Sequence, residues 1–302
     1  MAYVKKVFEN DKVRITVEQD EDCDSPRDMY DNFGHMICFH RNYVLGDKHE
    51  FENPRQFLEN LAYAQVMKSE FMKEKIVSKT TKWYRDNSVP EEDWEEMLDD
   101  AFIESNFGEL DDSDLMEVIL IDHVILPLYL YDHSGISMST GSFNDRWDSG
   151  QVGWTYATME EIKNNWMLKN GEETSDEYTK AAEKLLEGEV RTYNSYLTGN
   201  VWGFKLEEKT ETCETCSNNL ECPKSCDIEC SYGRNCGRLV PCSRKEDCEE
   251  RWEYEETDSC WGFFGWDNDD DMYREMVPKE YWKEFGIEPK KVYYTAGQDV
   301  AK

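Results

Sequence analysis

The sequence predicts an α+β fold with a mostly antiparallel sheet, packed helices and an inserted Cys-rich module. Short, alternating, β-branched segments separated by turn residues predict the strands. Apolar residues that recur at helical spacing in three longer segments predict the helices. A cluster of eight cysteines within residues 213–248 predicts the module, because so short a polar segment cannot bury a core of its own.

The expected strands come in antiparallel pairs. Asn10-Asp11 has turn composition and lies between two alternating segments, which predicts a hairpin at the start of the chain. Pro127 interrupts a buried run over residues 119–131, and it indicates either an edge strand or a bend between a helix and a strand. The segments expected as strands are residues 3–8, 13–17, 35–40, 136–138, 152–157, 201–206 and 260–266.

The expected helices have recognisable ends. Asn53 before Pro54 is an N-cap followed by a first-turn proline, and the apolar spacing that follows predicts a helix over 54–77. Residues 91–104 form an amphipathic pattern. Thr158 and Glu161 form a capping box for a short helix to Trp166, and a longer helix over 175–197 ends before Gly199.

Charge narrows the function classes. The chain of 302 residues has 34 Lys and Arg against 66 Asp and Glu, a formal net charge of −32. Such acidity disfavours direct binding to nucleic acid or to anionic membranes, both of which attract basic surfaces. No apolar stretch approaches the ~20 residues of a membrane span, and residues 1–10 lack the apolar segment of a signal peptide. We therefore expect a protein of the cytoplasm.

The clustered cysteines fit two kinds of structural cross-link. Four thiolates bind one zinc ion, so eight would close two structural Zn²⁺ sites, and the Cys-x-x-Cys at the start of the cluster has zinc-knuckle spacing. A disulfide module is the alternative, although a reducing compartment favours the metal. The candidate ligands are Cys213, Cys216, Cys222, Cys226, Cys230, Cys236, Cys242 and Cys248.

Two segments are candidate partner-binding surfaces. Residues 91–117 contain thirteen Asp or Glu and no Lys or Arg. A hairpin near residue 260 is rich in aromatic side chains and is followed by carboxylates, which suits a basic protein partner, although an aromatic core with a solvated loop explains it equally. The candidate residues are Glu91, Glu92, Asp93, Glu95, Glu96, Asp99, Asp100, Trp252, Trp261, Phe263 and Trp266.

The signals for catalysis are weak, and we expect no enzyme. Adjacent His133 and Ser134 after a buried run do not supply the geometry of a triad. Cys38 and His40 share one strand face. This suggests an alternative function, a metal-dependent hydrolase that uses Cys38, His40 and His133. A buried thiol and a hydrogen-bonded imidazole are the commoner explanation. Nucleotide-binding glycine motifs are absent from the sequence.

Several motifs together resemble a family of proteins encoded by bacteriophages and prophages. The resemblance covers about residues 20–200 and resumes near 258, so it implies one main domain, 1–206 with 258–302, and an inserted module, 207–257. The resemblance identifies no catalytic residues in this chain. The matching segments are Ser25-Pro26-Arg27-Asp28, Asp31-Asn32-Phe33-Gly34, Cys38-x-His40-Arg41-x-Tyr43-x-Leu45-Gly46-Asp47, Leu126-Pro127-Leu128-Tyr129-x-Tyr131-Asp132-His133-Ser134-Gly135, Trp147-Asp148-Ser149-Gly150-Gln151-Val152-Gly153, Tyr196-Leu197-Thr198-Gly199 and Ser259-Cys260-Trp261-Gly262-Phe263.

The resemblance implies an anti-defence function. The chain resembles phage proteins of the Gabija anti-defence type, which sequester a host complex of nuclease and helicase-like subunits. An acidic protein would be steered to the basic DNA channel of such a complex and could block DNA entry. We expect a non-catalytic inhibitor in the host cytoplasm. A zinc-stapled structural or regulatory phage protein is a further alternative, and self-association stays open.

Overall fold

The computed structural model describes residues 3–93, 99–165, 175–213, 227–229, 239–241 and 250–289. It confirms the α+β class, with the antiparallel strands arranged in two four-stranded sheets rather than one. The chain divides into two compact units: unit 1 comprises residues 1–23 and 199–302, and unit 2 comprises residues 24–198. The division into a main domain and a 207–257 module that the resemblance implies stays a prediction.

Unit 1 contains a sheet of strand order β1-β2-β7-β10. The hairpin of β1 (Val4–Glu9) and β2 (Val13–Gln19) is where the turn residues predicted it. The second hairpin is longer than expected, because β7 (Val201–Cys213) and β10 (Glu250–Phe264) pair along most of their length. Between them the structure also describes a short antiparallel pair, β8 (Asp227–Glu229) and β9 (Leu239–Pro241).

The two faces of this sheet differ. On one face, Phe8, Ile15 and Val17 pack against Met272 and Met276 of α8 (Asp269–Met276), and a short 3-10 turn (Lys279–Tyr281) leads to α9 (Trp282–Phe285). The other face carries charged side chains, with the rings of Tyr254 and Trp261 beside them. Its strands are joined by two ion pairs, Arg14 with Glu207 at 2.7 Å and Lys205 with Glu18 at 2.5 Å.

Unit 2 contains the second sheet, of order β3-β6-β4-β5. The strands are β3 (His35–Cys38), β4 (His123–Asp132), β5 (Ile136–Ser139) and β6 (Ser149–Thr158). Pro127 pairs with Trp154 of β6, whereas β5 pairs only with Tyr129–Asp132. On the β5 side the strand is therefore an edge at Pro127, which explains how a residue without an N–H is tolerated there.

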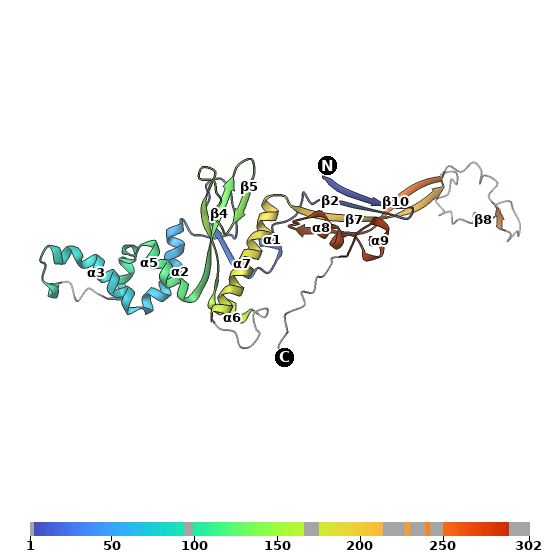
Figure 1. Cartoon of the computed structure of the whole chain (residues 1–302). Coiled ribbons are helices and arrows are strands. Elements are labelled where there is room, and N and C mark those ends of the chain that lie inside the picture. The colour runs from blue at the N-terminus through green and yellow to red at the C-terminus, as the bar shows by residue number, and fades with distance from the viewer. Residues whose placement is uncertain are drawn as a thin grey trace, which may run out of the picture. The chain divides into compact units, whose positions relative to one another are not determined.

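Helices cover both faces of this sheet (Figure 1). On one face lie α6 (Met159–Asn164) and α7 (Ser175–Leu197), against Met36, Leu128 and Ala157. On the other face Ile37, Ile125 and their neighbours pack against the helical cluster. That cluster consists of α2 (Pro54–Lys68), α3 (Glu70–Asp86), the 3-10 turns Glu91–Asp93 and Phe107–Glu109, α4 (Asp100–Ser105) and α5 (Asp112–Asp122).

Two expected helices differ from the structure. Asn53 caps the first as predicted, but Ser69 adopts an extended conformation and caps a new helix, so residues 54–86 form α2 and α3. Asp99 is also extended and caps α4, so a continuous helix over 91–104 is wrong. Asp and Ser side chains accept hydrogen bonds from free helix N–H groups, which lets each start a helix inside an apolar pattern.

Three further element ends in unit 2 can be traced to particular residues. The buried run over 119–131 bends at His123, where α5 ends and β4 begins. The capping box of Thr158 and Glu161 opens α6 as predicted, and α7 ends before Gly199, which has a φ of +68°.

Among the described residues, no helix combines the length and apolar character that crossing a bilayer requires.

Candidate functional site

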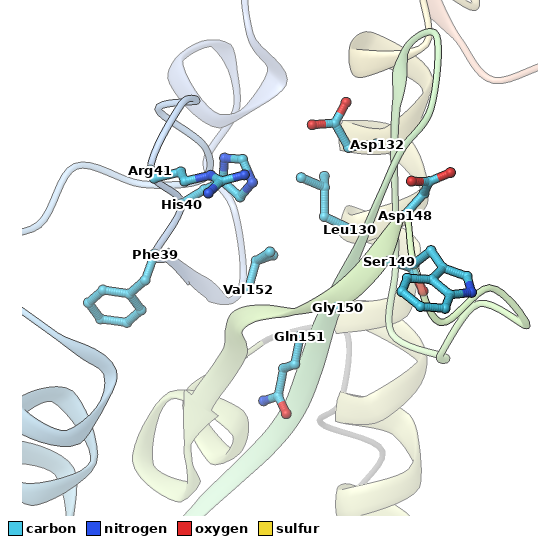
Figure 2. Close-up of a pocket in the computed structure, with 11 residues that line it drawn as sticks. Phe39, His40, Arg41, Leu130, Asp132, Asp148, Ser149, Gly150, Gln151 and Val152 are labelled. Carbon is cyan, nitrogen blue, oxygen red and sulfur yellow. The ribbon is translucent and has the colours of Figure 1, made fainter.

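Three segments that are distant in sequence meet around one cavity in unit 2. The cavity has a volume of about 520 Å³ and is lined by residues 39–41, by Leu130 and Asp132, and by residues 147–152. We call it the rim pocket. Figure 2 shows His40 and Arg41 on one side of the rim pocket and Asp132 and Asp148 on the other. All three segments belong to the motifs that carry the family resemblance.

The strand register brings the backbones of Asp132 and Asp148 together. Leu130 pairs with Gly150 and Tyr131 pairs with Ser149 across β4 and β6. One step further, the backbone N–H of Asp132 donates to the backbone carbonyl of Asp148 at 2.8 Å. Residues that oppose each other across an antiparallel pair point to the same face. Asp148 lies one residue before β6 begins, however, and its side chain turns to His133 whereas the Asp132 side chain turns to Tyr43, so the two carboxylates point apart (Figure 2).

Each carboxylate has one side-chain hydrogen bond. His133 Nδ1 lies 2.9 Å from Asp148 Oδ2, and the Tyr43 hydroxyl donates to Asp132 Oδ1 at 3.3 Å. The negative charge of Asp132, followed by burial and this hydrogen bond, raises the pKa of Tyr43. Tyr43 therefore stays protonated and joins the 39–45 segment to the end of β4.

A tight turn over residues 145–149 positions Trp147 at the rim pocket. Asp145 Oδ1 accepts hydrogen bonds from the N–H of Trp147 at 2.8 Å and the N–H of Asp148 at 2.9 Å. These two backbone hydrogen bonds, that from Asp148 first, lower the pKa of Asp145. The Ser149 hydroxyl also donates to the Asp145 carbonyl. The turn is thus fixed, yet the Trp147 side chain is 95% exposed.

The opposite wall is also ordered and exposed. The imidazole of His40 stacks on the ring of Tyr43, with 4.9 Å between centroids and 15° between planes. The next residue, Val44, is 96% exposed, whereas Leu45 is buried in the core. Gly46 follows with a φ of +69° and lies against Met36, so a side chain there would be strained. The segment thus turns outward at Val44 between two anchored residues.

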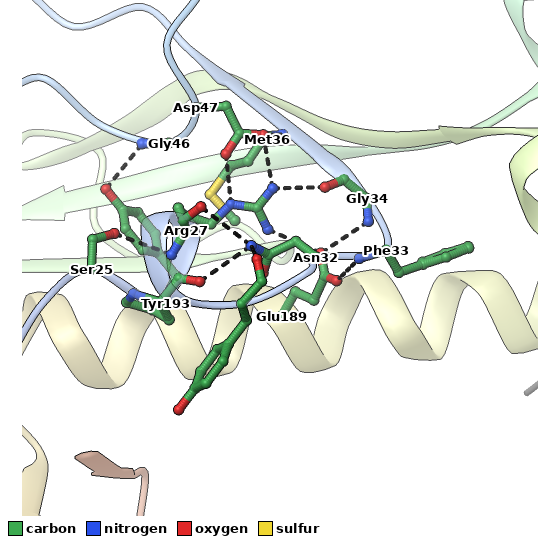
Figure 3. Close-up of polar contacts among 12 residues, drawn as sticks. Ser25, Arg27, Asn32, Phe33, Gly34, Met36, Gly46, Asp47, Glu189 and Tyr193 are labelled. Carbon is green, nitrogen blue, oxygen red and sulfur yellow. Dashed lines mark hydrogen bonds and ion pairs between the residues drawn. The ribbon is translucent and has the colours of Figure 1, made fainter. Parts of the chain in front are cut away.

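A buried arginine anchors this wall (Figure 3). The Arg27 side chain is only 4% exposed, and its guanidinium donates to both carboxylate oxygens of Asp47, at 2.7 and 2.8 Å. It also donates to Glu189 of α7 at 3.0 Å and to the Gly34 carbonyl at 2.7 Å. Burial opposes the charge of Arg27, but Asp47 and Glu189 outweigh it and raise the pKa.

The acceptors of this cluster also bind backbone. Asp47 accepts the N–H of Met36 at 2.7 Å, and Glu189 accepts the N–H groups of Phe33 and Gly34. The hydroxyl of Tyr193, on the same helix as Glu189, accepts the N–H of Gly46 at 2.9 Å. Charge-assisted bonds of this kind fix backbone geometry strongly. The motif residues around Arg27 are therefore structural, and they hold the 39–45 segment of the rim pocket in place.

The residues of the alternative hydrolase are poorly arranged for it. Cys38 is buried in the core, and burial raises the pKa of its thiol to about 12, so the thiolate needed by a nucleophile or metal ligand is disfavoured. His40 stacks on Tyr43, while His133 pairs with Asp148. In the described part of the chain, no three His, Cys, Asp or Glu side chains gather as metal ligands.

The acidic candidates are partly neutralised within the chain. Glu91 and Glu92 are exposed, and Asp99 caps α4. Asp100, by contrast, lies 3.0 Å from Lys73 of α3. Further along the acidic run, basic residues of α2 and α3 pair with Asp111, Asp112 and Asp114. The side chain of Asp93, together with Glu95 and Glu96, lies outside the described residues.

The aromatic candidates divide between core and surface. Phe263 and Trp266 are half-buried against the core of unit 1. Trp261 is 39% exposed and lies over Gly203, with the Lys205 ammonium 5.2 Å from its ring centroid. Cys213 ends β7, but its side chain, the side chain of Trp252 and the other seven clustered cysteines lie outside the described residues.

Sequence reasoning missed the residues at the centre of the rim pocket. Trp147, Asp148 and Asp132 entered it only as members of the matching segments, without a role of their own. The signal that could have identified them was their presence in the resemblance motifs. Trp147 is exposed, so packing in the core does not explain why it is part of a motif. Exposed motif residues indicate binding more than buried ones do.

Comparisons with protein families, with characterised proteins and with solved structures find no match to this chain.

Proposed function

We propose that this protein is a non-catalytic, phage-encoded inhibitor that binds a host nuclease-type defence complex, sequesters it and blocks its access to DNA. One observation carries the protein-binding part of the proposal: Trp147, which lines the rim pocket, is 95% exposed, and Val44, three residues after Arg41 of the same lining, is 96% exposed. The nuclease target and its Gabija type come from the resemblance to phage proteins. The inhibitor would act in the host cytoplasm.

The exposed side chains support an interface rather than a solvated loop. A tryptophan that leaves nearly all its surface in water forgoes the stabilisation that burial of a large aromatic side chain gives. Trp147 does so on a turn that Asp145 fixes, and Val44 does so between Tyr43, which is hydrogen-bonded to Asp132, and the buried Leu45. Tryptophan dominates interface hot spots, where a partner supplies the missing contacts.

Charge supports a basic partner. The net charge of −32 would steer the protein toward a positively charged DNA channel and raise the association rate. Part of the acidic run is paired internally, as the 3.0 Å contact of Asp100 with Lys73 illustrates. The exposed Glu91 and Glu92 and the carboxylates of the rim pocket stay candidates for the contact.

The alternatives receive less support. A hydrolase that uses Cys38 would need a thiolate, and the raised pKa of this buried thiol opposes one. A zinc-stapled structural or regulatory protein rests on the clustered cysteines, of which seven lie outside the described residues.

The test is native mass spectrometry of the protein co-expressed with a panel of host nuclease-type defence complexes. We expect a complex of defined mass, and the same spectra report any zinc mass. Trp147→Ala should weaken the complex at least about thirtyfold, as truncating a hot spot costs about 2 kcal/mol or more. Trp83→Ala is the matched control, because Trp83 is also exposed, at 64%, but lies on α3.

Two results would contradict the proposal. One is the absence of any complex from the whole panel, together with no protection of phage in infected cells. The other is a complex that Trp147→Ala and Trp83→Ala weaken equally, which would remove the rim pocket from the interface.

A further inference from the structure

We propose that the free edge of β1 is a docking site where an extended segment of a partner protein adds as a fifth strand to the four-stranded sheet of unit 1. This surface is separate from the rim pocket, and the inference does not depend on the nuclease target. It rests on backbone groups that β1 leaves without a ladder partner and on a cavity that runs along the same edge.

The first support is the pattern of hydrogen bonds along β1. The N–H of Asn10 donates to the carbonyl of Val13 at 3.0 Å, and hydrogen-bonded pairs in an antiparallel ladder recur at every second residue. Phe8 therefore also bonds to β2. Val7 and Glu9 direct their N–H and C=O groups to the other side, where no described strand lies. Such an edge is a template for another strand.

The second support is a cavity of about 630 Å³ beside this edge. The four consecutive residues from Lys6 to Glu9 line it. Successive side chains of a strand point to opposite faces, so a cavity that all four line runs along the edge of the strand. Tyr273, Phe285 and Ile287 form its apolar wall. An added strand would point every second side chain toward this wall, which is how strand addition gains specificity.

The opposite edge of the same sheet lacks this combination. There β10 carries Glu255, Glu256 and Asp258 at exposed positions, and its register shifts at two places. Charges and bulges are the means by which native sheets guard free edges against further strands. In β1 the register shift lies between Val4 and Lys6, so the half of the strand that lines the cavity is regular.

The side chains of this half define the segment that fits. Val7 is 44% exposed on the face away from the core and would pair best with a β-branched residue. The residue opposite Phe8 would enter the cavity and should be large and apolar. Opposite Glu9 we expect Lys or Arg, because opposite charges across a ladder stabilise the pair.

Charge around the cavity also favours a basic segment. Its charged lining residues are Lys6, Glu9, Asp270, Arg274 and Glu288. The guanidinium of Arg274 is already engaged, because it donates to Asp271 at 2.6 Å. Three lining carboxylates then face one lining ammonium, which suits a strand that has Lys or Arg at its ends.

The experiment follows backbone amide exchange in the ¹⁵N-labelled full-length protein by NMR. In the protein alone, the amides of Val7 and Glu9 should exchange at least about a hundredfold faster than that of Phe8, because only Phe8 donates to β2. Protection of Val7 and Glu9 in a monomer would mean that the chain itself covers the edge. Protection in a dimer would mean that a second copy does, and either result would overturn the proposal.

The ligand probe is a heptapeptide selected on the full-length protein from a random displayed library. We expect the selected sequences to share a β-branched residue next to a large apolar one, with Lys or Arg beside them. Binding should slow the exchange of the Val7 and Glu9 amides at least about tenfold. Methylation of the peptide nitrogens should weaken binding about tenfold at one set of alternate positions and little at the other, because only alternate N–H groups would face β1.

Protein variants test the same edge. Val7→Pro removes an outward N–H without touching the ladder to β2, so it should weaken peptide binding at least about tenfold. Thr257→Pro, at a register shift of β10 on the opposite edge, is the matched control and should leave binding unchanged. Asp270→Asn removes an exposed lining carboxylate and should weaken binding about threefold at low salt and less at high salt.

Three further results would overturn the docking site. They are a library that yields no binder, a binder that leaves the exchange of Val7 and Glu9 unchanged, and methylation that weakens binding equally at every position. Unchanged amide spectra show that the variants are folded, and the methylated peptides test the edge even if Val7→Pro does not fold. Because no defence complex is used, these results leave the proposed function to its own test.

Discussion

The guanidinium of Arg27 donates two hydrogen bonds to the carboxylate of Asp47, at 2.7 and 2.8 Å, across a separation of twenty residues. Replacing Arg27 by Met would leave Asp47 and Glu189 unpaired, and we expect a loss of roughly 3–5 kcal/mol in the free energy of unfolding. Arg27→Lys keeps the charge but loses the planar fork, so it should recover only part of this.

Urea denaturation measures the effect of these two variants. Arg191→Met, at an exposed position on α7, is the control and should change stability by less than about 0.5 kcal/mol. If Arg27→Met were as stable as Arg191→Met, the buried cluster would contribute nothing to the fold.

Asp114 gives a prediction for acid stability. Burial would raise its pKa, but hydrogen bonds from Lys75 and Lys79 outweigh this and lower the pKa to about 2, from an ordinary 3.8. A carboxyl whose pKa is lower in the folded state stabilises the fold above its unfolded pKa, so this contribution is complete above about pH 5 and is lost as the pH falls toward 2.

Asp114→Asn should therefore cost about 2 kcal/mol at neutral pH and show a smaller fall in stability between pH 5 and pH 2. Thermal unfolding across this pH range is the measurement. Asp112→Asn is the neighbouring control, because the Asp112 side chain is 70% exposed and pairs only at the surface with Arg55. Identical pH profiles for the two variants would be evidence against a special role for Asp114.

Two cysteines should differ sharply in reactivity. Cys38 is buried with a thiol pKa raised to about 12, whereas Cys260 is exposed. Because the thiolate is the reactive form, iodoacetamide at pH 8 should label Cys260 at least about a hundredfold faster than Cys38. Peptide mapping by mass spectrometry over time gives both rates in one sample. Comparable rates in folded protein would mean that Cys38 is reachable, which would restore interest in it as a nucleophile.

Gly203 has a packing role that alanine should break. A Cβ at this position would lie 2.2 Å from the Trp261 ring, so Gly203→Ala must displace the indole and should cost roughly 1–3 kcal/mol. Gly188, within α7, has open space around its Cβ position, and Gly188→Ala should stabilise the protein by about 0.5–1 kcal/mol. Opposite signs in a denaturant titration are the expected result. Adding Trp261→Ala to Gly203→Ala should relieve the clash, and no relief would place the strain elsewhere.

Local signals predicted much of the fold because their causes are local. The N-cap of Asn53, the capping box of Thr158 with Glu161 and the helix end before Gly199 each depend on a few adjacent residues. The breaks at Ser69 and Asp99 went unpredicted because the apolar pattern continues across them. At such positions, tertiary packing decides between one long helix and two short ones.

The candidate site was less predictable because its causes are distant in sequence. The pairing of Asp100 with Lys73, and of Asp114 with Lys75 and Lys79, depends on how α3 packs beside the acidic run, and no sequence window contains both partners. The same holds for the backbone hydrogen bond of Asp132 with Asp148, which continues the register of β4 and β6 beyond its last pair.

Connectivity gives unit 1 an unusual folding problem. Its strands β2 and β7 are hydrogen-bonded neighbours, with Gln19 opposite Trp202, yet the whole of unit 2 lies between them in the chain. During synthesis the β1–β2 hairpin must wait for its neighbour until residues 24–198 have been made. If unit 2 folds first, it brings residues 23 and 199 together and removes most of the loop-closure entropy that β2 and β7 would otherwise face. In that case a destabilising substitution in unit 2 should delay the folding of both units.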